Sequence, residues 1–449
     1  MPYLGNTPTT QSFTSGTDYF NGTGAQTAFT LSRTVNSVND IQVVVNNVVQ
    51  VPNDAYTLSG TTITFTSAPS SGTNNVYVRY LSTTTQVITP SQNTVSWNTL
   101  DSNTQGDLGI SFKNKIINGN MAIDQRNAGA SVTPTTTQYI TDRWALYCNQ
   151  SSKFSAQQNA GSVASPTGFT NYLGATSLSA YSVGSSDFFM FGQRIEGFNV
   201  ADLGWGTANA KTVTLSFWVR SSLTGTFGGS FVNSAGNRSY PYTYTVNSAN
   251  TWEQKSVTIA GDTSGTWLTT NGIGISLYFG LGAGSTWSGT AGSWSGNYYF
   301  TATGATSVVG TNGATFYITG VQLETGTQAT TFTLAGGSYG AEFSLCQRYY
   351  QISNNSGTGG IPTFIRQRTG TNEYYGAIPF LVQMRTSPTG TLNFGGSIIK
   401  PGFRYDGYTL SGSGFSQNQA FFLITPTIDD TSCTTCYGVG GTVSFSAEL

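Results

Sequence analysis

The chain has 449 residues, a formal net charge of −1 and no histidine. Because it contains no basic run, it lacks the electrostatic footprint of a nucleic-acid-binding protein, and DNA and RNA are rejected as partners. The absence of histidine excludes Ser-His and Cys-His nucleophilic catalysis. Since domains have about 100 to 200 residues, the length predicts about three domains.

The composition is typical of strands joined by tight turns. Only 8% of the residues are charged, whereas a typical soluble domain has about 25%. Thr, Val and aromatic residues favour strands and Gly and Asn favour turns, so we predict an all-β chain. The 13% of aromatic residues supply enough apolar area to argue against disorder.

Neither a membrane-spanning run nor a signal peptide is recognisable. No apolar run approaches the length of about 18 residues that spans a bilayer, so we expect no membrane insertion. The start MPYLGNTPTT has no basic or apolar leader region, and four cysteines are too few for a disulfide framework. We expect a soluble chain that begins where its gene does and is made in a reducing cytoplasm.

Residues 1–85 alternate strands and turns. Strands at 41–45 and 48–51 flank the dipeptide Asn46-Asn47, which favours a primed hairpin turn. A second hairpin is expected at 56–65, so the region is predicted to be a small N-terminal β-sandwich. Residues 86–113 have no clear period and are rich in Ser, Thr, Asn and Gln, which predicts a linker.

Strand patterns recur over residues 114–335 and predict a central jelly-roll sandwich. Trp144 and Trp218 lie on alternating strands and are expected in its core. One short helix is expected after Asn199, which can cap the segment VADLGWG. The expected strands are 139–148, 212–220, 240–246, 252–259, 273–279 and 314–323.

Residues 336–449 are predicted to form a C-terminal β-sandwich that begins with a helix. In the segment 339–350, Phe343, Cys346 and Tyr350 share one face at helical spacing. After this helix, strands are expected at 377–382, 390–394 and 420–424. The fold is therefore three β-sandwiches with one or two short helices.

Several motifs of the central region carry a family resemblance. NKIINGNMAIDQRNAGASVTPTTTQYITDRW at residues 114–144 resembles the module that recurs in bacteriophage tail fibres and related virion attachment proteins. The segments 193–222, 250–267, 313–326 and 342–350 are similar to the same family in the same order. The N-terminal FNGTGAQTAFTL resembles, more weakly, short virion-anchoring domains.

The resemblance implies a jelly-roll similar to carbohydrate-binding modules on a homotrimeric fibre or tail appendage of a phage virion. In such a protein the N-terminal domain, residues 1–85, anchors to other phage tail proteins. The distal domain, residues 336–449, contributes to attachment to a host-surface polysaccharide or receptor. The implied location is the virion tail, after synthesis in the host cytoplasm.

Two groups of residues are candidate ligand-binding sites because aromatic platforms beside polar groups recognise sugars. Trp287, Trp294, Tyr298 and Tyr299 lie in the Gly/Ser-rich segment 283–300; the alternative is that they pack a subunit interface or cover a sheet edge. The second group is Arg404, Tyr405, Asp406 and Tyr408.

Metal and redox chemistry have weak sequence support, and we predict no catalytic residue, metal or cofactor. Asn118-Gly119-Asn120 with Asp142 could supply oxygen ligands to Ca²⁺, but Asn-Gly is also a strong turn signal. Cys433 and Cys436 have CxxC spacing without partners for zinc; a turn with two thiols and a disulfide formed after release remain open.

The predicted function is a non-enzymatic tail-fibre component that mediates host attachment. A polysaccharide depolymerase is an alternative, since a glycosidase needs only two carboxylates. The only adjacent pair, Asp429-Asp430, has the sequence context of a turn. A purely architectural tail or collar protein is the other alternative.

Overall fold

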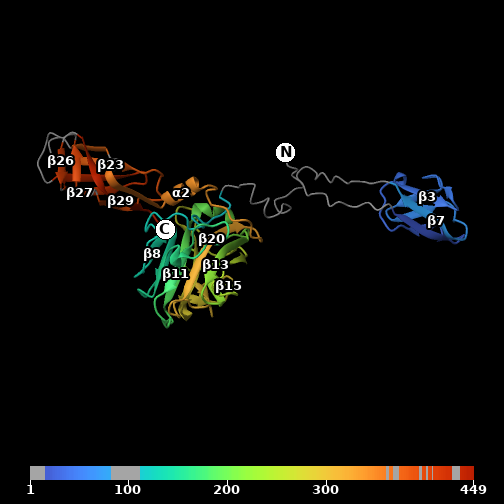
Figure 1. Cartoon of the computed structure of the whole chain (residues 1–449), viewed down its shortest axis with the longest axis horizontal. Helices are drawn as coiled ribbons and strands as arrows, with labels where there is room; N and C mark the ends of the chain where they lie inside the picture. The colour runs from blue at the N-terminus through green and yellow to red at the C-terminus, as the bar shows by residue number, and fades with distance from the viewer. Residues whose placement is uncertain are drawn as a thin grey trace. The chain divides into compact units, whose positions relative to one another are not determined.

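The computed structural model describes residues 16–81, 112–360, 364–367, 374–393, 397–400, 403–406, 408–426 and 435–449, and side chains within them at 16–81, 112–352, 376–391, 413–423 and 444–449. The chain forms two compact units, Met1–Val95 and Ser96–Leu449. Both are built almost entirely of strands, which confirms the predicted all-β class (Figure 1). The division of the second unit near residue 336 stays a prediction.

The first unit is a small sandwich of a four-stranded sheet, ordered β1-β7-β3-β4, and a three-stranded sheet, ordered β2-β6-β5. Both predicted hairpins are confirmed. Asn46 and Asn47 have φ of 49° and 65°, the left-handed conformation that a primed turn requires. The elements are β1 (Thr17–Gly22), β2 (Ala28–Thr30), η1 (Val38–Asp40), β3 (Ile41–Val45), β4 (Val48–Val49), β5 (Tyr56–Ser59), β6 (Thr62–Phe65) and β7 (Gly72–Tyr80).

The second unit contains a sandwich, here called the central sandwich, of a five-stranded sheet (β10-β11-β20-β13-β16) and a six-stranded sheet (β15-β14-β17-β12-β9-β8). Neighbouring strands in both sheets are antiparallel. The strands are β8 (Gln138–Thr141), β9 (Trp144–Cys148), β10 (Phe154–Gln158), β11 (Leu173–Ser177), β12 (Phe188–Glu196), β13 (Val213–Ser221), β14 (Gly225–Val232), β15 (Ser239–Val246), β16 (Glu253–Ile259), β17 (Ile273–Ala283), β18 (Ser288–Gly289), β19 (Thr301–Ala302) and β20 (Thr315–Thr325).

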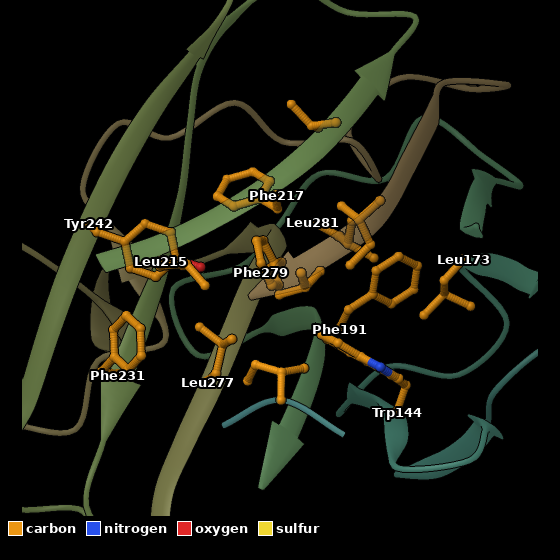
Figure 2. Packing of buried hydrophobic residues seen from close by; sticks show 14 of the residues in the cluster. Trp144, Leu173, Phe191, Leu215, Phe217, Phe231, Tyr242, Leu277, Phe279 and Leu281 are labelled. Carbon is orange, nitrogen blue, oxygen red and sulfur yellow. The ribbon is translucent and has the colours of Figure 1, made fainter. Parts of the chain in front are cut away.

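Aromatic rings from the two sheets meet in the core of the central sandwich (Figure 2). Phe217 of β13 and Phe279 of β17 have ring centroids 5.0 Å apart, and Trp144 lies beside Phe279, fully buried as predicted. Trp218 is not in this core. Since side chains alternate along a strand, the buried Phe217 places its neighbour Trp218 on the opposite, outer face of the five-stranded sheet. The core assignment of Trp218 was wrong.

Helical structure is short and partly differs from the prediction. The segment after Asn199 forms two 3-10 turns, η4 (Gly197–Asn199) and η5 (Ala201–Leu203), without a side-chain cap. The second helix is confirmed as α2 (Tyr339–Gln347), whose first turn is capped by Ser338, but it is shorter than predicted, and Tyr350 begins β21 instead of lying on the helix. The other 3-10 turns are η3 (Ala160–Ser162) and η6 (Ser285–Trp287).

After α2 the chain forms a mostly antiparallel nine-stranded sheet in which β29 pairs with four other strands. The strands are β21 (Tyr350–Gly360), β22 (Phe364–Gln367), β23 (Tyr374–Pro379), β24 (Thr389–Asn393), β25 (Ser397–Lys400), β26 (Phe403–Asp406), β27 (Tyr408–Phe415), β28 (Gln419–Pro426) and β29 (Thr435–Ser446). Across the described ranges, no helix has the length and apolar character needed to cross a membrane.

The residues that follow β29 are held by three arginines of the central sandwich and by Arg385, which lies between β23 and β24. Arg126 and Arg143 both donate to the carboxylate of Glu448, and Arg194 donates to the carbonyl of Leu449. The guanidinium of Arg385 donates to the carbonyls of Ala447 and Glu448. We call these four arginines with Glu448 the arginine clamp. It ties the root of the nine-stranded sheet to the central sandwich.

Asp142, beside the clamp, predicts a dependence of stability on pH. Burial raises its pKa to about 6, although hydrogen bonds from Gln125 and the charge of Arg126 oppose the shift. A carboxyl whose folded pKa exceeds its unfolded value of about 4 binds its proton more tightly in the folded state, so stability falls as pH rises through about 6. The full difference corresponds to about 3 kcal/mol.

We therefore expect the unfolding free energy to decrease between about pH 4 and pH 7, and the decrease to be smaller in Asp142→Asn. Urea titrations at several pH values measure both slopes. Glu342, whose pKa is also raised by burial, leaves a residual slope of the same sign in the variant. Equal slopes for the two proteins would contradict the assignment to Asp142.

Candidate functional site

The predicted aromatic segment 283–300 folds back on the six-stranded sheet. Trp287 is half-buried, its Nε1 donates to the carbonyl of Ser186 at 2.8 Å, and its ring stacks on Phe300 at 5.0 Å. Phe300 belongs to a buried cluster on the outer face of that sheet with Tyr147 and Tyr278. Trp287 therefore covers part of this cluster on the face of the sheet.

The other three residues of the group have separate surroundings. Trp294 packs edge-on against Trp205 and Trp267, and its Nε1 donates to the carbonyl of Ala260. Tyr298 is 37% exposed and lies against Phe300. The hydroxyl of Tyr299 accepts a hydrogen bond from Asn297 at 3.0 Å. Of the four, Tyr298 is the most exposed, and a ligand role for the group stays a prediction.

The second predicted group lies on two neighbouring strands of the nine-stranded sheet. Arg404, Tyr405 and Asp406 belong to β26, and Tyr408 begins β27. Their side chains are outside the described part of the structure, and so is the side chain of Cys436. Asp429, Asp430 and Cys433 lie outside the described residues altogether. These predictions remain untested.

The side-chain oxygens of Asn118 and Asp142 that were considered for Ca²⁺ accept hydrogen bonds, whereas Oδ1 of Asn120 is buried and has no hydrogen-bond partner among the described residues. The Asn118 side chain accepts from the backbone of Ile123 and donates to the carbonyls of Ile123 and Asp142. Both carboxylate oxygens of Asp142 accept from Gln125. Among the described residues, no three His, Cys, Asp or Glu side chains gather in a way that could hold a metal ion. The arrangement fits the turn interpretation.

A different face carries aromatic and polar groups side by side. On the outer face of the five-stranded sheet, Trp218 is half-buried and stands directly opposite the exposed Gln254 of β16. Two residues further along β13, Arg220 stands opposite Tyr317 of β20. Because cross-strand partners have Cβ atoms about 5 Å apart, an indole, an amide and a guanidinium share one surface.

A bulge in β20 shapes this surface. The register of β13 against β20 shifts between Ser216 and Trp218, at Gly320, whose φ is +61°. A Cβ on Gly320 would lie 2.6 Å from the ring of Phe169 and 3.2 Å from the indole of Trp218. Glycine therefore permits both the bulge and the approach of two aromatic rings.

Further rings support Tyr317 from the side. Tyr172 and Trp252 pack against it with centroids 5.5 and 6.4 Å away. A Cβ on Gly174, opposite Tyr317, would come within 2.4 Å of its ring, so glycine makes room for the tyrosine here too. The guanidinium of Arg220 lies 5.4 Å from the Tyr317 centroid. We call Phe169, Trp218, Arg220 and Gln254 the Trp218 face; Tyr317 is buried and supports Arg220 without adding exposed surface.

The Trp218 face has the chemistry of a sugar-binding platform. A half-buried indole on an outer face offers an apolar surface to the C–H face of a sugar ring, and amide and guanidinium groups donate hydrogen bonds to its oxygens. This surface was not predicted from the sequence because Trp218 was expected in the core. The alternation of Val213, Leu215, Phe217 and Val219 with the residues between them was the signal that could have placed it outside.

No family model matches the sequence, and no curated protein matches it either. Among solved structures, the chain is similar to the enzymatically active domain of tailspike protein 4 of bacteriophage CBA120, with 10% identity and a TM-score of 0.25, over 47% of this chain and 21% of that one. A family 4 carbohydrate-binding module is similar over 46% of this chain and 98% of its own, with 14% identity and a TM-score of 0.25.

A family 11 carbohydrate-binding module from Clostridium thermocellum, in complex with a mixed-linked tetrasaccharide, is similar over 44% of this chain and 96% of its own, with 12% identity and a TM-score of 0.23. The chain thus spans only 21% of the length of the tailspike domain. TM-scores this low carry no argument about what the chain does. The fold is therefore described from the sheets of the chain itself: a small sandwich in the first unit, and the central sandwich and the nine-stranded sheet in the second.

Proposed function

We propose that the chain is a non-enzymatic structural component of a phage tail fibre or tail appendage that attaches to host-surface glycans. The observation that carries the glycan-binding part is the Trp218 face, where a half-buried indole stands opposite an exposed amide. The tail-fibre part rests on the sequence resemblance at residues 114–144 and the motifs that follow it. The proposed location is the virion.

In this proposal the first unit anchors the chain to other tail proteins, and the second unit contacts the host. The chain assembles as a homotrimer, so each fibre presents three copies of the Trp218 face. Linked weak sites can exceed the affinity of a single site by about 10² to 10⁴ when all of them engage together. Weak contacts with sugars therefore suffice for stable attachment.

Binding of the purified chain to envelope polysaccharide from a susceptible host tests the glycan part. We expect saturable binding, and we expect the chain to compete with phage adsorption. A chain that neither binds polysaccharide nor competes at saturating concentration would favour the architectural alternative. Release of reducing ends from the polysaccharide, lost on substitution of a single Asp or Glu, would favour the depolymerase.

Light scattering tests the trimer separately from the ligand. At micromolar concentration the proposal requires the mass of three chains. A measured mass of one chain would contradict the trimer and the gain in affinity from linked sites. It would not contradict binding of a glycan by a single Trp218 face.

A further inference from the structure

The guanidinium of Arg220 is oriented without a carboxylate partner. Its Nε donates to the backbone carbonyl of Asn250 at 3.0 Å, and its plane lies near the ring of Tyr317. Within the ranges whose side chains are described, none of the ion pairs involves Arg220. Arg126, Arg143, Arg238 and Arg348 each contact a carboxylate instead.

These contacts leave the outer edge of the guanidinium free to donate. With Nε bound to Asn250, the two Nη groups retain donors in the planar fork that suits a carboxylate. Packing against Tyr317 restricts the side chain before any ligand arrives, which lowers the entropy lost on binding. Arg220 is thus held in place as a half-buried cation on an otherwise aromatic and amide-bearing surface.

The spacing along β13 relates this cation to Trp218. Residues two apart on a strand point to the same face and lie about 7 Å apart. A sugar ring stacked on the indole of Trp218 can place an exocyclic group toward Arg220, while Gln254 lies across from the indole on the neighbouring strand β16. A carboxylate is the exocyclic group that a guanidinium fork binds best.

We infer that the Trp218 face takes an acidic glycan, with a uronate-type ring stacked on Trp218 and its carboxylate bound by Arg220. This inference rests on the proposed glycan-binding function and adds the class of sugar. The contribution of Arg220 is charge-dependent, so binding to the acidic polymer weakens as salt concentration rises, whereas stacking on Trp218 changes little.

The test uses matched polymers and the full chain. Polygalacturonate, alginate and hyaluronate are each compared with their carboxyl-reduced forms, which differ only in the acidic group. We expect at least one acidic polymer to bind about tenfold more tightly than its reduced form. We expect Arg220→Gln to remove this preference without changing the binding of the reduced polymer.

Two further variants distinguish recognition of the carboxylate by the guanidinium of Arg220 from a general effect of positive charge. Arg220→Lys should restore little of the preference, because an ammonium lacks the planar fork. Arg79→Gln removes an exposed charge from the first unit and should leave the preference unchanged. Thermal melting of each variant shows whether the fold is intact.

The outcomes for the inference and for the proposed function differ. Binding of neutral glycans through Trp218, with no preference for any acidic polymer, would overturn the acidic-glycan inference and leave the function standing. An unchanged preference in folded Arg220→Gln would overturn the role of Arg220. Failure to bind any glycan, host envelope polysaccharide included, would overturn the proposed function itself.

Discussion

Replacing Glu448 with alanine is expected to lower the unfolding free energy of the second unit by about 3 to 5 kcal/mol. Arg143 is 1% exposed and Glu448 7% exposed, and the same carboxylate also binds Arg126 at 2.6 Å. Removing the carboxylate leaves two guanidinium groups without their shared anion in a buried site. An unpaired buried charge costs far more than an exposed ion pair contributes.

Urea denaturation of the variant, beside a matched control, measures this effect. Asp202→Ala removes a carboxylate that pairs with Lys115 but is 49% exposed, and it should cost less than about 1 kcal/mol. Glu448→Gln keeps the shape of the side chain but not its charge, and its loss of unfolding free energy should lie between those of Glu448→Ala and Asp202→Ala. Similar small losses for Glu448→Ala and Asp202→Ala would show that the arginine clamp does not hold the nine-stranded sheet to the central sandwich.

Trp218→Ala is expected to weaken binding to the host polysaccharide by about tenfold or more. Burying an aromatic side chain against a ligand contributes about 1.5 to 3 kcal/mol, and about 1.4 kcal/mol corresponds to a factor of ten in affinity. Because Trp218 is outside the buried core cluster, the variant should remain folded. Isothermal titration with a defined oligosaccharide of the host polymer measures the change.

Tyr298→Ala is the matched comparison, since Tyr298 is the exposed ring of the sequence-predicted segment 283–300. We expect its affinity to stay within about twofold of the parent chain, which corresponds to less than about 0.5 kcal/mol. The reverse pattern, with a large loss for Tyr298→Ala and none for Trp218→Ala, would move the binding site to the six-stranded sheet.

Local patterns predicted much of the fold. The Asn46-Asn47 dipeptide predicted a hairpin correctly because, apart from glycine, asparagine is among the residues that adopt the left-handed conformation most readily. The single strand expected at 139–148 was instead two strands, β8 and β9, since Arg143 has φ of 69° and turns the chain. The spacing of hydrophobic residues does not predict such a turn.

Glycine-rich strands were harder to predict than β-branched ones. The β14 strand, GTFGGSFV, contains three glycines and was missed because glycine is typical of turns. A Cβ on Gly229 would lie 2.1 Å from the carbonyl of Tyr278, so close packing against β17 requires glycine there. Such a reason becomes visible only when the neighbouring strand is known.

Long-range ion pairs have no local signal. Arg126 and Glu448 are separated by 322 positions, and Arg143 and Glu448 by 305. The arginine clamp therefore could not be read from sequence patterns. The Trp218 face was partly predictable. Strand β13 was expected from the sequence, but the side of the sheet on which Trp218 lies depends on the alternation of buried and outward-facing residues along β13 and on the bulge at Gly320.

Fluorine NMR of the chain labelled with 5-fluorotryptophan tests the central claim most directly. The chain has eight tryptophans, and the resonance of Trp218 is assigned from its loss in Trp218→Phe. On titration with host polysaccharide, the account predicts that the Trp218 resonance shifts while those of Trp287 and Trp294 stay in place. A shift of Trp287 or Trp294 with Trp218 unmoved would contradict glycan binding by the Trp218 face.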